Sequence, residues 1–244
     1  MKQKNILLTG GSGKLGKAII SSGVFPSIKA PSHKALDITD AVKVSRFFKT
    51  NKINVVIHAA AKARMAECEK DPIGALRVNI IGTSNLVSEI LKSRRIIRFI
   101  YISTDGVYCG NKGNYSEASG LMPYNKYGWA KLGGECAVTL LPNHCIIRTS
   151  FFDPKKISFK DAARDMYSSK VDINCLVDAL RVMVEKRYVG VVNIGSKKSS
   201  DYDKYKRYKP GIGSCRFKDI RKNLSFNIAR DSSLDTKLWK RLKK

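Results

Sequence analysis

The amino-acid sequence predicts an α/β fold built on a doubly wound parallel sheet, with helices covering both of its faces. Through the first 150 residues, short and continuously apolar segments alternate with segments whose apolar residues recur at helical spacing. This is the pattern of parallel strands that are buried on both faces. The chain of 244 residues, 43% of them hydrophobic, is also long enough to bury a sizeable core. Right-handed crossovers between such strands give the doubly wound arrangement.

The expected strands and helices follow one another in alternation along the chain. We expect strands over residues 5–9, 54–58, 96–103, 145–149 and 189–194. We expect helices over residues 14–22, 40–50, 72–92, 124–141 and 173–186. Pro72 suits the start of the third helix, because its missing N–H would have no partner in a first turn.

The pattern weakens after Ser150. Residues 151–169 show no clear period, residues 196–213 are polar and predict a loop, and residues 224–244 contain one late helix at most. We therefore expect a Rossmann domain over residues 1–150. A small substrate-binding portion over residues 151–244 is expected to pack on the carboxyl edge of the sheet, where ligands of such folds bind.

The composition is strongly basic, with a formal net charge of +26. Such a chain attracts polyanions, but its basic residues are spread along the whole sequence. We interpret them mainly as a solvated basic surface. A phosphate-bearing substrate is the next interpretation, and we do not expect nucleic acid to be the main partner. No apolar run approaches the roughly 20 residues that a membrane span needs, and the apolar stretch 6–8 behind the basic start is too short for a signal peptide. We expect a cytoplasmic protein without membrane association.

The six cysteines and three histidines are scattered and show no spacing typical of a metal site. We therefore expect reduced thiols and no metal. Cys109 follows an expected strand, and we interpret it as a bystander thiol.

A glycine-rich turn follows the first expected strand and opens the first helix. Gly10, Gly13 and Gly16 are spaced GxxGxxG, which allows a tight turn and a close approach of the backbone to a pyrophosphate. The helix that follows would present free N–H groups to the phosphates. A P-loop is the alternative, but the turn lacks a GKS or GKT ending. We expect Gly10, Gly13, Lys14, Leu15 and Gly16 to bind a dinucleotide, which makes residues 1–150 an NAD(P)-binding domain.

Residues 29–34, which correspond to the end of the second strand of a dinucleotide-binding fold, favour NADP(H) over NAD(H). An acidic residue there would bind a ribose 2′-hydroxyl and repel a 2′-phosphate. Residues 29–34 are basic instead, and we expect Ser32 and His33 to take part in binding the cofactor. Exposed basic residues without this role are the alternative, so NAD(H) remains open.

Tyr127 and Lys131 are four residues apart and should lie on one face of a helix. A lysine beside a phenol lowers the pKa of that phenol, so the tyrosine could exchange a proton with a carbonyl or an alcohol. The pair follows the strand that ends near Thr104, whose carboxyl end should face the cofactor. These residues are candidates for hydride-transfer chemistry.

Several motifs in this order resemble the extended short-chain dehydrogenase/reductase superfamily. They are residues 9–16, 36–40, 58–61, 79–86, 103–105 and 127–131. The resemblance implies that Asp37 and Ile38 flank the adenine. It implies a hydrogen bond from Thr104 to the substrate oxygen beside Tyr127. It also implies that further residues contact the cofactor. These further cofactor residues are Ala59, Ala60, Ala61, Asn79, Ser103, Tyr127 and Lys131.

Within that superfamily the sequence is similar to the dTDP-4-dehydrorhamnose reductase group. Residues 37–40, 102–105, 147–150 and 233–238 carry this likeness. It implies an NAD(P)H-dependent oxidoreductase of deoxysugar biosynthesis, such as that of rhamnose, acting on a nucleotide-linked 4-keto-6-deoxy sugar. Gly106 stands where 4,6-dehydratases have an acidic residue and where this group usually has an aromatic one. The region 150–172, which normally helps to form the substrate pocket, is short.

Four residues at or near strand ends are candidates for substrate contact: Arg64, Glu67, Asp105 and Arg148. An ion pair is the alternative for Arg148. Two other functions stay open, an epimerase with tightly bound NAD and a catalytically silent NAD(P)-binding regulatory or scaffold subunit. The nucleotide sugar is the expected partner, and a homodimer is compatible with the sequence.

Overall fold

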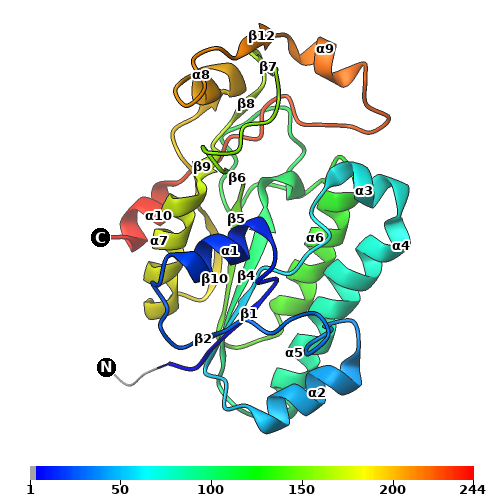
Figure 1. Ribbon diagram of the computed structural model, residues 1–244, viewed down its shortest axis with the longest axis vertical. Coiled ribbons are helices and arrows are strands. Elements are labelled where there is room, and N and C mark those ends of the chain that lie inside the picture. Colours follow the sequence, from blue (N-terminus) through cyan, green and yellow to red (C-terminus); the bar gives the residue numbers. More distant parts are fainter. Residues whose placement is uncertain (1–3) are drawn as a thin grey trace.

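The computed structural model describes residues 4–244, and residues 1–3 of the expected N-terminal domain lie outside the described part. A sheet of six parallel strands crosses the molecule in the order β10-β5-β4-β3-β1-β2 (Figure 1). Because every pairing is parallel, all six carboxyl ends meet at one edge. The strands are β1 (Ile6–Thr9), β2 (Ile28–Lys29), β3 (Val55–His58), β4 (Arg98–Thr104), β5 (His144–Thr149) and β10 (Gly190–Asn193).

Helices cover both faces of this sheet, as the buried strands require. Helices α1 (Lys14–Ser21) and α7 (Ile173–Glu185) pack on one face. Helices α2 (Ala41–Thr50), α5 (Thr83–Lys92) and α6 (Lys126–Val138) pack on the other. The doubly wound α/β fold predicted from the sequence is therefore confirmed.

The expected helix over residues 72–92 is helical throughout but is not one α-helix. It consists of α4 (Pro72–Ala75), the π-helical segment η1 (Leu76–Gly82) and α5. A π-helical segment bulges the backbone and is frequent at functional sites. A further helix, α3 (Met65–Lys70), precedes it and was not predicted. These elements bring η1 against α6.

The C-terminal portion lies beyond the carboxyl edge of the sheet, at the top of Figure 1. Short strand pairs form it, together with helices α8 (Asp201–Lys206) and α9 (Phe217–Arg221). Helix α10 (Lys237–Leu242) instead packs beside α7 and β10. The pairs are β6 (Phe151–Phe152) with β9 (Val171–Asp172), β7 (Asp161–Ala163) with β12 (Gly213–Cys215), and β8 (Tyr167–Ser168) with β11 (Ser199–Ser200). The single late helix expected after residue 224 is α10. Strand β10 and helix α7 also come from residues after 150, so the chain returns to the sheet.

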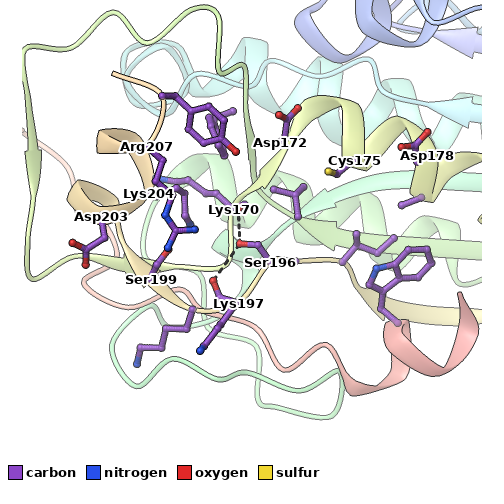
Figure 2. A pocket seen from close by; sticks show the side chains of 18 of the residues that line it. Lys170, Asp172, Cys175, Asp178, Ser196, Lys197, Ser199, Asp203, Lys204 and Arg207 are labelled. Carbon is purple, nitrogen blue, oxygen red and sulfur yellow. Dashed lines mark hydrogen bonds between the residues drawn. The ribbon is translucent and has the colours of Figure 1, made fainter. Parts of the chain in front are cut away.

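The loop predicted over residues 196–213 was wrong, because this segment contains β11 and α8. Ser200 caps α8 by accepting the Asp203 N–H at 3.0 Å. Tyr205 packs into a small apolar cluster with Ala162 and Ile212. This one buried tyrosine anchors a helix whose other residues are mostly polar, which is why periodicity did not reveal it. Helix α8 and the turn after it border a groove (Figure 2).

Within residues 4–244, the structure has no helix that is both long and apolar enough to span a bilayer.

Candidate functional site

The glycine turn between β1 and α1 lies at the carboxyl edge of the sheet. Gly10 has φ +77°, and a Cβ there would lie 2.6 Å from the Ala60 backbone nitrogen. A Cβ on Gly16 would collide with the Gly10 carbonyl oxygen. Gly13 is the N-cap of α1 and supplies no side-chain cap, so the first N–H groups of α1 are not satisfied by a side chain of the N-cap. A phosphate is the kind of group that such a helix end accepts.

The segment after β3 passes close to this turn and is held in place by Asn79 of η1. The Asn79 Oδ1 accepts the Lys62 N–H at 2.8 Å, and its Nδ2 donates to the Lys62 carbonyl at 3.1 Å. Both groups of the side-chain amide are therefore satisfied by one backbone residue. This fixes the path of 59–61, which runs half-buried beside Gly10.

His58, at the end of β3, links this strand to β1 and to α5. Its Nδ1 lies 2.6 Å from the Thr9 hydroxyl, and its Nε2 lies 3.0 Å from the Thr83 hydroxyl. Thr83 donates its own proton to the Asn79 carbonyl at 2.8 Å. Nε2 is therefore the protonated nitrogen and Nδ1 the acceptor. Burial, with a smaller effect of the Lys131 charge, lowers the pKa of His58 to about 3.

We expect this neutral histidine to make the protein acid-sensitive. As the pH falls below 6.5, the histidine of the unfolded chain becomes protonated. In the folded protein His58 stays neutral until the pH approaches its lowered pKa of about 3. The free energy of unfolding should therefore fall as the pH drops through this window, by on the order of 5 kcal/mol in total. Urea unfolding at a series of pH values measures this. In His58→Asn the free energy of unfolding should depend less on pH, whereas the control His33→Asn, at an exposed histidine, should keep the dependence of the wild type. If the free energy of unfolding changed with pH equally in the wild type and in His58→Asn, His58 would not be the cause.

The residues expected to be catalytic converge at the carboxyl end of β4. Thr104 is the last residue of β4, and Tyr127 and Lys131 project from α6, which Asn125 caps by accepting the Gly128 N–H at 2.9 Å. The Thr104 hydroxyl lies close enough to Tyr127 to act on the pKa of its phenol, which it lowers. The Thr104 hydroxyl also accepts the Gly106 N–H at 3.0 Å. The three side chains thus lie at the edge that also holds the glycine turn.

The electrostatics of this pair differ from the expectation. Burial raises the pKa of Tyr127 above its ordinary value, and the Asp105 charge adds to this rise. Lys131 does not offset it, because its Nζ lies over the Tyr101 ring, 3.9 Å from the ring centre. Burial in turn lowers the pKa of Lys131 to about 7. The structure therefore holds Tyr127 as a neutral phenol, the form that can donate a proton.

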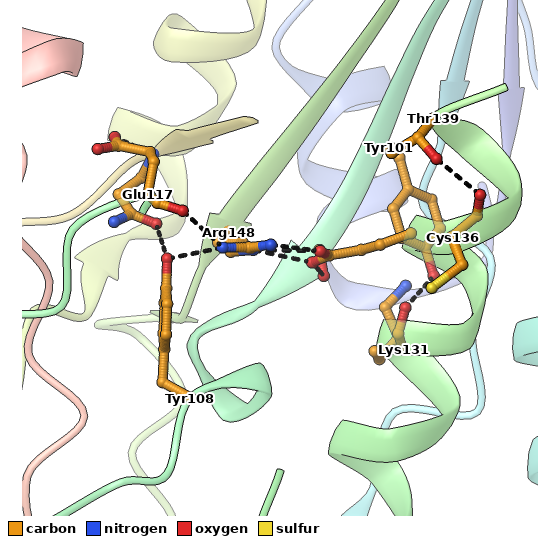
Figure 3. Close-up of polar contacts among 10 residues, drawn as sticks. Tyr101, Tyr108, Glu117, Lys131, Cys136, Thr139 and Arg148 are labelled. Atoms are coloured by element: carbon orange, nitrogen blue, oxygen red, sulfur yellow. Dashed lines mark hydrogen bonds and ion pairs between the residues drawn. The ribbon is translucent and has the colours of Figure 1, made fainter. Parts of the chain in front are cut away.

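A buried ion pair joins Glu135 of α6 to Arg148 of β5, which is labelled in Figure 3. An ion pair was one of the two roles expected for Arg148, but Glu135 was not expected as its partner. Glu135 accepts hydrogen bonds from Arg148, with Nη2 to Oε2 at 2.7 Å, and from the Ser103 hydroxyl. Arg148 also donates to the Tyr108 hydroxyl at 3.0 Å. The Arg148 side chain is only 4% exposed, so of its two expected roles the structure has the ion pair. The sequence signal that could have identified Glu135 is its spacing, because it lies four residues after Lys131 and so on the same face of the helix.

Asp105 joins three parts of the chain at the site. Its Oδ2 accepts the Ser150 hydroxyl at 2.7 Å and the Ser232 hydroxyl at 2.8 Å, while its Oδ1 accepts the Thr104 hydroxyl at 3.2 Å. The carboxylate is buried. It therefore links the ends of β4 and β5 to the C-terminal segment, directly beside the catalytic candidates.

The other candidates lie further out. Arg64 and Glu67 are exposed and pair with each other at 2.9 Å. Ser32 and His33 lie exposed on the turn after β2, where the His33 ring is 3.5 Å from the Asp37 carboxylate. Ile38 is buried beside η1. The structure does not bring Arg64 or Glu67 together with the Thr104 group through any hydrogen bond or ion pair among the described residues.

Comparison with known proteins places the chain in a family. The family described as RmlD substrate binding domain matches residues 4–180. The chain belongs to this family. A curated relative, dTDP-4-dehydrorhamnose reductase from Aggregatibacter actinomycetemcomitans, is 33% identical over 152 residues, which are 60% of this chain and 51% of that protein. Methionine adenosyltransferase 2 subunit beta from Xenopus tropicalis is 33% identical over 144 residues, or 55% of this chain and 42% of that protein. The chain spans about half the length of the curated relatives it matches.

Solved structures of RmlD-type reductases share the fold across nearly the whole chain. A dTDP-4-dehydrorhamnose reductase from Clostridium acetobutylicum has a TM-score of 0.83 at 25% identity, covering 94% of this chain and 89% of that one. The Bacillus anthracis reductase, solved in complex with NADP, has a TM-score of 0.87 at 21% identity, covering 99% and 93%. The resemblance to this reductase group that the motifs predicted is confirmed.

Proposed function

We propose that this RmlD-family chain is an NAD(P)H-dependent reductase of a nucleotide-linked 4-keto-6-deoxy sugar, with NADP(H) as the preferred cofactor. The observation that carries the proposal is the convergence of Thr104, Tyr127 and Lys131 at the edge that also holds the glycine turn. The sugar nucleotide would bind between this edge and the portion 151–244. The reductase relatives support this substrate class.

The chemistry assigned to the chain's own residues is a proton transfer coupled to reduction of a ketone. A reduced nicotinamide, when bound, supplies the hydride to the carbonyl carbon. Thr104 and Tyr127 hold the carbonyl oxygen by hydrogen bonds, and Tyr127 donates its proton to that oxygen as the alcohol forms. Lys131, whose Nζ lies over the Tyr101 ring, would turn toward Tyr127 to stabilise the phenolate that is left. The raised pKa of Tyr127 supports its role as the acid, because its proton is in place at neutral pH.

The glycine turn fits the pyrophosphate of a dinucleotide, because its glycines have no side chains to block the backbone and because α1 begins there without a side-chain cap. We expect Gly10→Ala to lose cofactor affinity and to lower the free energy of unfolding by at least about 1 kcal/mol, because alanine is strained at φ +77°. Titration with NADPH and urea unfolding measure the two effects. Gly120→Ala is the matched control, since a Cβ there meets nothing within 4 Å. Equal affinities in the two variants would contradict the assignment.

The preference for NADP(H) rests on the turn after β2, where residues 30–34 contain no carboxylate. We expect the wild type to bind NADPH more tightly than NADH. We expect His33→Glu to reduce or reverse the ratio of the two dissociation constants, because a carboxylate there would repel a 2′-phosphate. An unchanged ratio in this variant would remove the turn from the cofactor site.

The reaction is tested by transfer of label. The chain is incubated with 4-deuterated NADPH and a dTDP-linked 4-keto-6-deoxy sugar, and the sugar product is analysed by mass spectrometry. We expect one deuterium in the reduced sugar nucleotide, together with oxidised cofactor. Product without deuterium and without net oxidation would instead identify an epimerase.

A second candidate function is an NAD(P)-binding subunit of another enzyme. The observation in its favour is the 33% identity to a methionine adenosyltransferase beta subunit. The presence of Thr104, Tyr127 and Lys131 together favours the reductase, since a pure scaffold needs none of them. Cofactor binding without turnover of any sugar nucleotide would support the subunit.

A further inference from the structure

A groove in the described structure has a lining that is distinct from the residues of the proposed active site. It has a volume of about 1380 Å³ and runs between α7, the segment 194–200, α8 and α10 (Figure 2). None of the described residues that we assign to catalysis, cofactor binding or substrate contact lines it. The reductase chemistry therefore does not account for the groove.

The groove is strongly basic, with eight lysine or arginine residues and three aspartates among its described lining residues. Arg181 comes from α7, Lys197 from the segment after β10, Arg207 from the end of α8 and Lys243 from the end of α10. From the sequence, nucleic acid was not expected to be the main partner, because the basic residues are dispersed along the chain. The fold brings these dispersed residues onto one surface.

The buried and the exposed cations of the groove differ in what they contact. Lys170 is bound to Asp201 at 2.8 Å, and Lys204 donates to the Ser168 hydroxyl at 3.0 Å, so both serve the protein itself. In contrast, Lys197 and Arg207 are exposed, and no carboxylate lies within ion-pair distance of either among the described residues. A compact phosphate would require fixed, buried donors. Long exposed cations along a groove instead suit a flexible chain of phosphates.

Aromatic rings are available in the same groove. Tyr208 is 48% exposed and packs edge-on against Phe152, with ring centres 5.3 Å apart. Trp239 of α10 lies half-buried at another part of the lining. Rings interleaved with cations are the means by which proteins bind unpaired bases, since every base has a face that can stack.

We propose that this groove binds single-stranded nucleic acid, as a second site beside the reductase site. Lys197, Arg207, Arg181 and Lys243 would contact the phosphodiester backbone. Tyr208 would stack on a base. The site would show little sequence preference, because the buried donors Lys170 and Lys204 of the lining are already bound to Asp201 and Ser168.

The test is fluorescence anisotropy of a labelled oligothymidine of about 12 nucleotides with the full chain over a range of salt concentrations. We expect binding whose logarithmic salt slope is about −0.7 for each phosphate contacted. The double variant Lys197→Glu/Arg207→Glu should weaken binding by at least about tenfold. The matched control Lys49→Glu/Lys92→Glu makes the same change of net charge at exposed residues of α2 and α5, and it should bind nearly as the wild type does.

Two further measurements distinguish a nucleic-acid site from a membrane-binding surface and from a part of the substrate site. In Trp129→Phe the only tryptophan is Trp239, and its fluorescence should change when the oligonucleotide binds. Turnover of the sugar nucleotide should be the same in the groove double variant as in the wild type. The proposal is overturned if both charge variants weaken binding equally, or if vesicles containing phosphatidylserine bind and the oligonucleotide does not. It is also overturned if the groove variant raises KM for the sugar nucleotide, since the groove would then be part of the substrate site.

Discussion

Replacement of Tyr127 by phenylalanine is expected to lower kcat for the reduction by about 10²–10⁴-fold while leaving cofactor binding nearly unchanged. The variant removes one oxygen, the phenol oxygen beside Thr104 that holds the proton to be transferred. The ring and its packing against the adjacent apolar cluster of Cys68, Ala75 and Ala130 remain. Stopped-flow or steady-state oxidation of NADPH measures kcat, and a separate titration measures the cofactor dissociation constant.

Tyr202→Phe is the matched control, because it removes the same atom from a tyrosine of α8 that does not contact the Thr104 group. Its kcat should stay within about twofold of the wild type. If Tyr127→Phe also kept its kcat, another group would have to supply the proton. The general-acid assignment would then be wrong.

Removal of the charge of Glu135 is expected to lower the free energy of unfolding by about 3–5 kcal/mol. In Glu135→Gln the guanidinium of Arg148 stays buried, with a 4% exposed side chain, but loses the carboxylate that neutralises it. The Ser103 hydroxyl loses an ionised acceptor in the same change. Denaturant unfolding, with a check that the m value is unchanged, measures the effect.

The control is the exposed pair of Lys4 and Glu185, whose side chains are 36% and 53% exposed. Glu185→Gln should cost no more than about 1 kcal/mol. The double variant Glu135→Leu/Arg148→Met should recover much of the loss, because an apolar pair leaves no uncompensated charge. A loss in the double variant as large as in Glu135→Gln would show that packing, and not the buried charge, causes the instability.

The sheet and its helices could be predicted because the strands are buried on both faces. In β1, β3 and β4 every residue is buried, and such continuous apolar runs are visible in a sequence. The prediction of secondary structure failed where an element is held by a few buried residues and not by a continuous apolar run. Helix α8 depends on one buried tyrosine, Tyr205, and the π-helical segment η1 depends on contacts with distant residues such as Lys62. Neither leaves a periodic signal.

The candidate site was predictable in its members but not in its electrostatics. The helical spacing identified the pair Tyr127 and Lys131, and the resemblance to the reductase superfamily implied the role of Thr104. The raised pKa of Tyr127 and the position of Lys131 over the Tyr101 ring depend on three-dimensional burial. The same holds for Glu135 and for Ser232, whose partners lie 13 and 127 residues away. Long-range contacts of this kind have no local sequence signature.

The most direct test of the reductase proposal is turnover by the purified chain. The protein is mixed with NADPH and, one at a time, with nucleotide-linked 4-keto-6-deoxy sugars, while the absorbance of the reduced nicotinamide is followed. We expect a loss of absorbance that requires one of these sugars and that is nearly abolished in Tyr127→Phe. If NADPH binds but its absorbance is stable with every sugar, the chain is not a reductase of this class, and the NAD(P)-binding subunit becomes the better account.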